Sequence, residues 1–387
     1  MAKAIDLPYY NKERRIFQTM CSPLGPPKIS IGDKIKDQFL VKKKLGEGSC
    51  GMVYLVLNIK DTKRAAMKVE PLMKSKDDEI LKMEVYVLKK MQQSKHVCQL
   101  LAAGKTSSYN FLIMSLLGKE LSDIRRRLHD RKMSVGSVLK IGIQSTTAIH
   151  DLHKVGFVHR DIKPSNFAMG RDEKANIVFM FDFGLARQIM FPDKDGKLKL
   201  REARKKVAFR GTVRYCSLNV HLYREQGRHD DLWSMFYMLI ELLSSTLPWK
   251  GMARKDSAHV KQTVSDRVLL AGCPDCFADI NNHLKSLTYI DTPNYAMFQS
   301  KFTKELNKLK IKPTDPFEWN EKGFLKQEAS VAHENEKDVK VEIDKTGDTN
   351  TGRFVDESVE SEESIGGSET TGLAGENTLE VLDPDKK

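Results

Sequence analysis

The sequence predicts an α+β fold in which a small β-rich lobe precedes a larger α-helical lobe. Short apolar runs of strand character dominate up to Ser115, whereas helical spacing of apolar residues dominates from Val135 to Leu309. At 387 residues, the chain can hold a two-lobed domain of roughly 250–300 residues together with tails. Its longest apolar stretches are well short of the roughly 20 residues that a membrane span needs.

The first lobe is expected over residues 37–114, with five antiparallel strands and one helix. The strands are predicted at 39–45, 52–57, 64–69, 98–105 and 111–115. Residues 77–91 have apolar side chains at helical spacing, and Glu84 lies on the same stripe as Ile80 and Val87. A carboxylate on the inward face of a helix needs a cationic partner.

The second lobe is expected over residues 115–318. Its first long helix is predicted by one apolar face that runs from Val135 to Leu152, and helices dominate again from Asp230 to Leu309. Residues 1–36 are predicted to be an irregular extension, because they are polar and contain Pro23, Pro26 and Pro27 without a sustained period. Residues 319–387 are predicted to be an acidic, disordered tail, since so few apolar groups cannot offset the ordering entropy.

Charge divides the chain into two unequal parts. Between Glu328 and Lys387 there are 17 acidic and 6 basic side chains, a net charge of −11. Because the whole chain has a formal charge of +12, the first 327 residues carry +23. A basic body attracts polyanions, which include nucleic acid, anionic membranes and acidic protein substrates.

The termini and the cysteines indicate a cytosolic or nuclear protein. The first residues have no apolar run that would make a signal peptide. Six scattered cysteines do not form a disulfide framework, which is typical of a reducing compartment. The pair Cys273 and Cys276 is interpreted as loop or core cysteine, because a zinc site would need a second ligand pair.

A glycine-rich segment and a lysine follow each other in the first lobe. Gly46–Gly51 has the pattern GxGxxG between two predicted strands and is followed by Val53. Such a loop brings backbone N–H groups close to phosphate, although an ordinary turn can have the same composition. Lys68 lies in an apolar strand, where its charge needs a partner, and Glu84 is the predicted one.

The most specific segment is HRDIKPSN at residues 159–166. Phosphoryl transfer needs a carboxylate to orient a hydroxyl, a cation near the phosphate and an amide oxygen on a metal, all on one rigid loop. Asp161, Lys163 and Asn166 match these needs. Sixteen residues further on, an apolar run ends in Asp182 of a DFG triplet, which is a suitable Mg²⁺ ligand.

This series of motifs resembles the protein kinases over residues 36–309. The resemblance implies a two-lobed kinase fold, ATP and Mg²⁺ as cofactors, catalytic roles for Lys68, Glu84, Asp161 and Lys163, and Mg²⁺ held by Asn166 and Asp182. It also implies a set of ATP-binding residues, with Met114 behind the adenine and residues 115–117 as the hinge. This set is Leu45, Gly46, Glu47, Gly48, Ser49, Cys50, Gly51, Val53, Ala66, Lys68, Met114, Ser115 and Leu117.

Several motifs are narrower and resemble the casein kinase I group, and within it the tau-tubulin kinases. Residues 211–219 read GTVRYCSLN where most kinases have Ala-Pro-Glu, and residues 164–170 and 227–233 are similar to the same group. Cys216, Leu218 and the loop tip Ser49 and Cys50 depart from the usual pattern. The resemblance implies a serine/threonine kinase, and Asp231 is expected to brace the catalytic loop.

Such kinases favour acidic or phosphorylated protein substrates, and this sequence has a physical basis for that preference. Seven Lys and Arg residues lie between positions 194 and 206, close to the catalytic segment, and phosphate pairs well with arginine. Arg204, Arg214 and Lys261 are predicted to form an anion site, with a solvated basic loop as the alternative. The expected partners are protein substrates, cytoskeletal ones included, with no nucleic acid or membrane required, and the protein is expected to be a monomer that acts in signal transduction.

Two other functions are weighed against an active kinase. A pseudokinase scaffold would lack one of the catalytic groups, yet Lys68, Asp161, Asn166 and Asp182 are all present. A polyanion-binding protein would use its basic body on RNA or membrane, but the sequence has neither the aromatic motifs of RNA-binding sheets nor a basic amphipathic helix.

Overall fold

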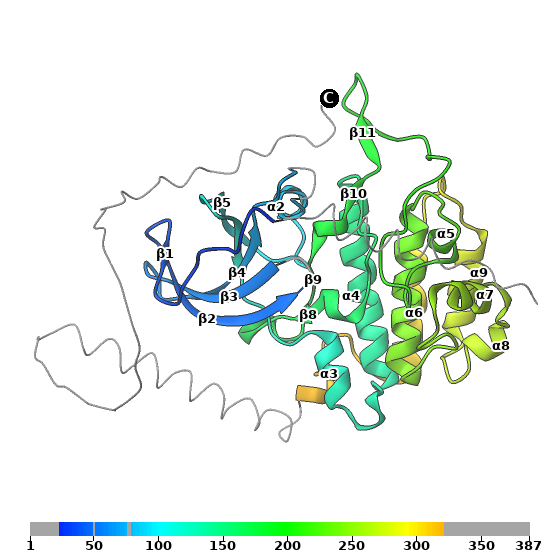
Figure 1. Cartoon of the computed structure of the whole chain (residues 1–387). Helices are drawn as coiled ribbons and strands as arrows, with labels where there is room; N and C mark the ends of the chain where they lie inside the picture. Colours follow the sequence, from blue (N-terminus) through cyan, green and yellow to red (C-terminus); the bar gives the residue numbers. More distant parts are fainter. Residues whose placement is uncertain (1–22, 49–50, 76–78, 321–387) are drawn as a thin grey trace, which may run out of the picture. The chain divides into compact units, whose positions relative to one another are not determined.

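The computed structural model describes residues 23–48, 51–75 and 79–320. Over this range the chain has a sheet-based first lobe and a helical second lobe (Figure 1). Most of the predicted N-terminal extension (residues 1–22) and of the predicted acidic tail (321–387) lies outside the described residues.

The first lobe contains an antiparallel sheet of six strands in the order β1-β2-β3-β4-β6-β5. The strands are β1 Lys34–Ile35, β2 Phe39–Gly48, β3 Gly51–Asn58, β4 Arg64–Pro71, β5 Leu100–Lys105 and β6 Tyr109–Ser115. Strand β1 adds to the five predicted strands and begins inside the segment expected to be irregular. It forms because Ile35 pairs with Phe39 and is buried, and a two-residue strand is too short to leave a period in the sequence.

One face of this sheet forms the core of the lobe. The core side chains alternate along each strand, as in Met67 and Val69 of β4 or Phe111 and Ile113 of β6. Lys68 lies between Met67 and Val69 and therefore on the opposite face. Helix α2 (Leu81–Lys90) packs against β5 and β6. It begins later than the predicted residue 77, and residues 77–78 lie outside the described part of the chain.

The second lobe is built around two long helices, α4 and α6, and α4 also packs against α10 (Figure 1). Ser134 caps α4 by accepting a hydrogen bond from the Ser137 amide at 3.3 Å. Asp230 stabilises the start of α6, because its carboxylate accepts the Gly227 amide at 2.7 Å. The helices are α3 Leu121–Arg127, α4 Val135–Lys154, α5 Leu218–His221, α6 Arg228–Ser244, α7 Arg254–Thr263, α8 Asp266–Leu269, α9 Cys276–Ser286 and α10 Tyr295–Lys308.

Short two-stranded ladders and 3₁₀ turns hold the loops between the helices. The ladders pair β7 (Phe157–Val158) with β10 (Arg187–Gln188), β8 (Phe167–Met169) with β9 (Val178–Met180), and β11 (Met190–Pro192) with β12 (Leu198–Leu200). The turns are η2 His129–Arg131, η3 Pro164–Asn166, η4 Asp172–Lys174, η5 Phe183–Leu185 and η6 Glu318–Asn320. None of the described helices has the length and apolar character needed to cross a bilayer.

Residues 316–320 belong to a second compact unit of the chain, which begins at Pro316. They contain η6, and the ring of Phe317, just before this turn, stacks on that of Trp319 with the centroids 4.6 Å apart.

Candidate active site

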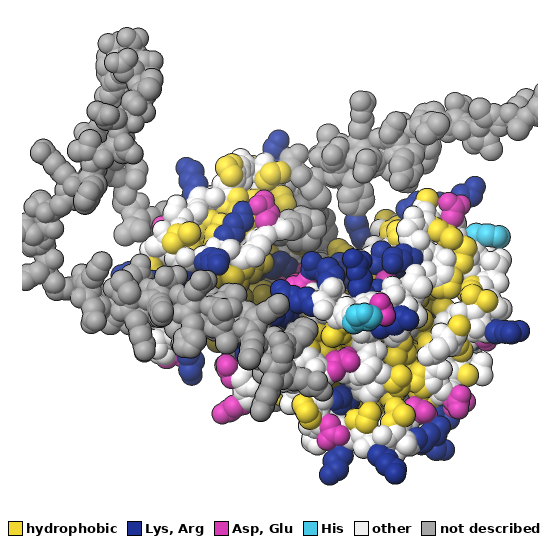
Figure 2. All heavy atoms as spheres, turned by 90° about the horizontal axis from the view of Figure 1, so that it is seen from below, with side chains coloured by type: hydrophobic (Ala, Val, Ile, Leu, Met, Phe, Trp, Pro, Cys, Tyr) yellow, Lys and Arg dark blue, Asp and Glu magenta, His cyan; other side chains and the backbone are white. Residues whose placement is uncertain are grey.

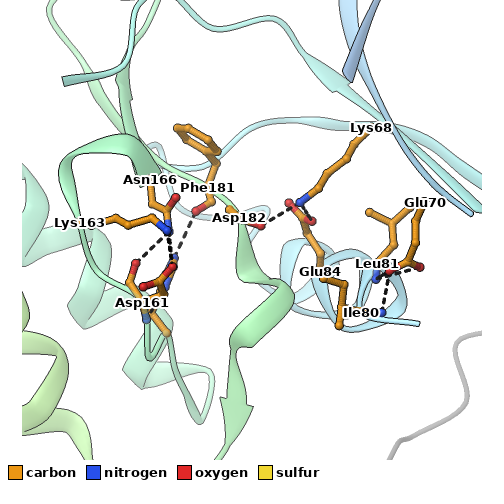
Figure 3. A network of polar contacts seen from close by, with 11 residues as sticks. Lys68, Glu70, Ile80, Leu81, Glu84, Asp161, Lys163, Asn166, Phe181 and Asp182 are labelled. Carbon is orange, nitrogen blue, oxygen red and sulfur yellow. Dashed lines mark hydrogen bonds and ion pairs between the residues drawn. The ribbon is translucent and has the colours of Figure 1, made fainter. Parts of the chain in front are cut away.

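The loop between β7 and η3 gathers polar groups around one carboxylate. Asp161 is buried, and its Oδ2 accepts a hydrogen bond from the Lys163 ammonium at 2.6 Å. Its Oδ1 accepts one from the Thr212 hydroxyl at 2.6 Å. The side-chain amide of Asn166 donates to the Asp161 carbonyl at 2.8 Å (Figure 3). The predicted residues Asp161, Lys163 and Asn166 are therefore brought together by one loop.

Asp231 of α6 braces this loop, as the resemblance implied. Its carboxylate accepts the backbone amides of His159 at 2.7 Å and of Arg160 at 2.9 Å. His153 contacts the same carboxylate through Nε2 at 2.9 Å. Burial disfavours charge on Asp231, but these partners outweigh it and keep the pKa of Asp231 below its ordinary value. A rigid helix thus fixes the backbone beside Asp161.

A second cluster surrounds Lys68 on β4. Its ammonium lies 2.6 Å from a carboxylate oxygen of Glu84 and 2.8 Å from one of Asp182 (Figure 3). The predicted ion pair between Lys68 and Glu84 is therefore present. Burial disfavours charge on Lys68, yet the two carboxylates outweigh it and raise the pKa of the ammonium. The Lys68 ammonium remains positive at any ordinary pH.

Asp182 follows β9 and has a left-handed backbone, with φ of 64°. Burial opposes charge on its carboxylate, but Lys68 outweighs it and holds the pKa of Asp182 below its usual value. An ionised carboxylate and the amide oxygen of Asn166 are hard donors that suit Mg²⁺, which usually takes one or two carboxylates plus phosphate oxygens. Across the described ranges, no cluster of three or more His, Cys, Asp or Glu side chains could hold a metal by itself.

The glycine-rich segment forms the hairpin of β2 and β3, in which Gly48 pairs with Gly51. Gly51 has φ of +124°, and a Cβ added there would lie 2.0 Å from the Val69 carbonyl oxygen, so only glycine fits. Leu45, Gly46 and Glu47 are exposed along β2. The predicted residues Ser49 and Cys50 lie outside the described residues.

The remaining predicted nucleotide residues lie on the strands around Lys68. Val53 pairs with Lys68, and Ala66 pairs with Met114 across β4 and β6. Ala66 and Met114 are buried, whereas Leu117 is half-buried. The amide of Ser115 donates to the Gln99 carbonyl at 3.0 Å, so this donor is used within the protein.

Comparison with known proteins agrees with this geometry. The protein kinase domain family matches residues 39–305, which is more than half of the chain. The chain belongs to the protein kinase family. The predicted two-lobed kinase fold is thereby confirmed.

Two relatives of this chain are named as serine/threonine-protein kinases. A Dictyostelium discoideum protein named as a probable serine/threonine-protein kinase is 40% identical over 293 residues, which span 75% of this chain and 58% of the relative. A Caenorhabditis elegans protein named as a serine/threonine-protein kinase is 36% identical over 307 residues, which span 78% of this chain and 87% of the relative.

Thr212 is a site residue of this kinase that the sequence analysis missed. It bonds to Asp161 from a position 51 residues away in the chain. The preceding Gly211 has φ of +111°, and a Cβ there would lie 2.5 Å from the Arg160 carbonyl oxygen. The sequence signal that contains Thr212 is the GTVRY motif at residues 211–215.

The three residues predicted to form an anion site each have a partner within the kinase. Arg204 bonds to Glu225 through its Nε at 2.5 Å, and Arg214 bonds to the buried Glu241 at 3.1 Å. The buried Lys261 donates to the carbonyls of Val213 at 2.7 Å and Cys216 at 2.6 Å. Burial lowers the pKa of Lys261 to about 8. Each of the three cations therefore has an internal acceptor, and their joint anion site stays a prediction.

Proposed function

We propose that this chain is an active kinase that transfers the γ-phosphate of ATP to serine or threonine hydroxyls of proteins. The observation that carries the proposal is the bonding of Asp161 to Lys163 and Thr212, beside a Lys68 that is paired with Glu84 and Asp182. A chain that had become a scaffold would have no need to keep both clusters complete.

Each group would have a separate task. Asp161 would orient the attacking hydroxyl and accept its proton, while Lys163 would sit beside the transferring phosphate. Lys68, aimed by Glu84, would bind the α- and β-phosphates, and the amides of the glycine hairpin would cover them. Mg²⁺, when bound, would neutralise phosphate charge. Asp182 and Asn166 would hold it.

Adenine recognition would fall to the strands next to Lys68. Val53, Ala66 and Met114 offer apolar surface at adjacent register positions. Since the Ser115 amide already bonds to Gln99, we assign the reading of the adenine edge to the Ser115 carbonyl and to the backbone of Leu117.

The test is phosphoryl transfer from Mg-ATP to casein by the pure chain, with Lys68→Met beside it. Transfer by the native chain alone would support the proposal. Equal background from both proteins, with ATP binding retained by the native chain, would instead favour the scaffold.

We further propose that the kinase is of the casein kinase I type, closest to the tau-tubulin kinases, and prefers acidic or phosphorylated substrates. Support comes from six exposed cationic residues of the activation segment: Lys194, Lys197, Lys199, Arg204, Lys205 and Lys206. Two of them, Arg204 and Lys205, line a hollow of about 310 Å³ together with Arg224, Glu225 and residues 287–289 among others. On the face shown in Figure 2, Lys and Arg side chains gather in a band near the centre.

Arg204 and Lys261 make a matched pair for testing this preference. The Arg204 side chain is 41% exposed and could leave Glu225 for a substrate phosphate, whereas the Lys261 ammonium is enclosed. Arg204→Ala should therefore lower the ratio of activity on phosphorylated over unphosphorylated peptides, by roughly tenfold for one lost charge-assisted pair. Lys261→Met should leave that ratio unchanged. An unaltered ratio in Arg204→Ala would contradict the proposed anion site.

The proposal also includes a cytosolic or nuclear location, a monomeric state, a part in signal transduction and cytoskeletal proteins among the substrates. Phosphorylation of purified tubulin would test the cytoskeletal substrates. Gel filtration of the full chain would test the monomeric state.

A further inference from the structure

Glu70 on β4 is a buried carboxylate that the proposed chemistry does not use. Its side chain is 1% exposed. An acid removed from water to this extent needs hydrogen-bond donors around it, because burial without partners is costly. The identity of those donors therefore indicates what the residue does.

The donors to Glu70 come from the start of α2. Its Oε1 accepts the backbone amide of Ile80 at 2.8 Å and that of Leu81 at 3.2 Å (Figure 3). The side-chain amide of Asn110, on β6, contacts its Oε2 at 3.4 Å. Strand β4 thus reaches the first amides of the helix through Glu70, and β6 supports Glu70 through Asn110.

Helix α2 has no cap of its own at this end. The residue before it is Ile80, whose side chain accepts no hydrogen bond. The first amides of any helix lack acceptors within the helix, and the N-terminus favours negative charge. Glu70 supplies the missing acceptor from a different element of the fold.

The register of β4 makes this contact relevant to the active site. Lys68 and Glu70 are two residues apart on a strand, so their side chains leave the same face. Lys68 reaches Glu84, and Glu70 reaches residues 80 and 81, one helical turn earlier. The helix is therefore held to the strand at two points. Any movement of α2 that preserves the pair of Glu84 and Lys68 must also preserve the bonds from residues 80 and 81 to Glu70.

The same end of α2 borders the turn that follows Asp182. Helix α2 packs against η5, and the Ile80 side chain lies 3.3 Å from the place where a Cβ of Gly184 would be. Displacement of the helix start would thus disturb both carboxylates that surround Lys68.

We propose that Glu70 is a positioning residue, which anchors the N-terminus of α2 to β4 and thereby keeps Glu84 on Lys68. The inference deepens the proposed kinase function, because it assigns a support to the Lys68 cluster. Because Glu70 is 1% exposed, we assign it no direct contact with nucleotide or substrate.

Hydrogen exchange of the full-length chain tests the anchor without any need for activity. Glu70→Ala should speed exchange of the amides at residues 80–84 by roughly five- to tenfold, the range expected for a lost helix cap. Amides of α4 should not change. Glu70→Gln keeps an acceptor oxygen and should stay close to the native rate, and Glu70→Asp, with a shorter side chain, should lie between.

Glu79 offers a matched control. It is a buried acid next to the same helix end, but its carboxylate pairs with Lys82 at 2.6 Å. Glu79→Ala should leave exchange at residues 80–84 at the native rate. If Glu70→Ala and Glu70→Asp both exchange like the native chain in this segment, the anchor does not exist.

Kinetics then separate positioning from a general effect on folding. Glu70→Ala should lower kcat/KM for ATP by a similar five- to tenfold, and Glu70→Gln should restore it. Since Glu70 acts through Glu84, the double variant with Glu84→Ala should be no slower than Glu84→Ala alone. Losses that multiply would overturn the inference. A native chain without any transfer activity would refute the proposed function, while the exchange rates would still decide on the anchor.

Discussion

The Lys68 cluster and the activation segment both contain cations paired with carboxylates, but the two pairs differ in their exposure to solvent. The side chains of Lys68 and Glu84 are 11% and 3% exposed. Arg204 is 41% exposed, although its partner Glu225 is buried. Removing one partner from a buried pair leaves an uncompensated charge, whereas a pair that reaches solvent can exchange partners at small cost. The first arrangement suits a fixed catalytic geometry, and the second suits capture of a ligand.

The catalytic loop should give the largest effect of any single substitution. Asp161→Asn keeps the size of the side chain but removes the carboxylate that accepts bonds from Lys163 and Thr212. We expect kcat to fall by about 10³-fold, within the range of general-base catalysis. Steady-state kinetics with Mg-ATP and casein would measure it. Asp279→Asn, which changes an exposed acid paired with Lys301, should have native activity.

Glu84→Gln tests the buried pair of this comparison, Lys68 and Glu84. Lys68 would retain Asp182 but lose the partner on α2, so the ammonium would no longer be held toward the helix. We expect kcat/KM for ATP to fall by roughly 100-fold, as for loss of a buried charged partner. A fall of less than threefold would mean that this pair does not aim Lys68.

The pH dependence of stability should report on Glu70. Burial raises the pKa of Glu70 to about 7, although bonds from Leu81, Asn110 and Ile80 act in the opposite direction and Glu79 adds to the rise. Glu79, the charged group that acts on this pKa, is itself paired with Lys82 of α2 at 2.6 Å.

A raised carboxylate pKa means that the folded state holds the proton more tightly than the unfolded state. The contribution of Glu70 to the free energy of unfolding is therefore complete below its ordinary pKa and is lost as pH rises through about 7. The loss is at most roughly 3 kcal/mol. Thermal unfolding between pH 5 and 8 would show the native chain losing stability relative to Glu70→Gln. If the thermal stability of both proteins changes with pH in the same way, the raised pKa of Glu70 is contradicted.

Glu225→Gln should give the smallest effect and probes the exposed side of the comparison. Arg204 holds the pKa of Glu225 below its ordinary value despite burial, so Glu225 competes with any substrate anion for this arginine. Removing its charge should raise the preference for acidic peptides by about threefold at low salt and less at high salt. Competition assays with acidic and neutral peptides at two salt concentrations would measure it. An equal preference at low salt would mean that Arg204 does not contact substrate.

The outcome of the sequence predictions follows the distance along the chain between the residues involved. Asp161, Lys163 and Asn166 lie within six positions of one another, so one loop brings them together whatever the rest of the fold does. The pair of Lys68 and Glu84 was predictable because a charge in an apolar strand and a charge on an apolar helix face need each other. The anion site of Arg204, Arg214 and Lys261 rests on charge alone and stays a prediction. Their partners are Glu225, Glu241 and two backbone carbonyls.

The sequence by itself determined the family of this protein and the identity of its reactive groups, because motifs of a few residues specify both. The tertiary structure alone decided two of the groups that support them. Thr212 meets Asp161 and Glu70 meets the start of α2 only because separate elements converge in the folded chain. A buried polar group takes whichever partner packing brings within hydrogen-bond distance, and no local pattern records that choice.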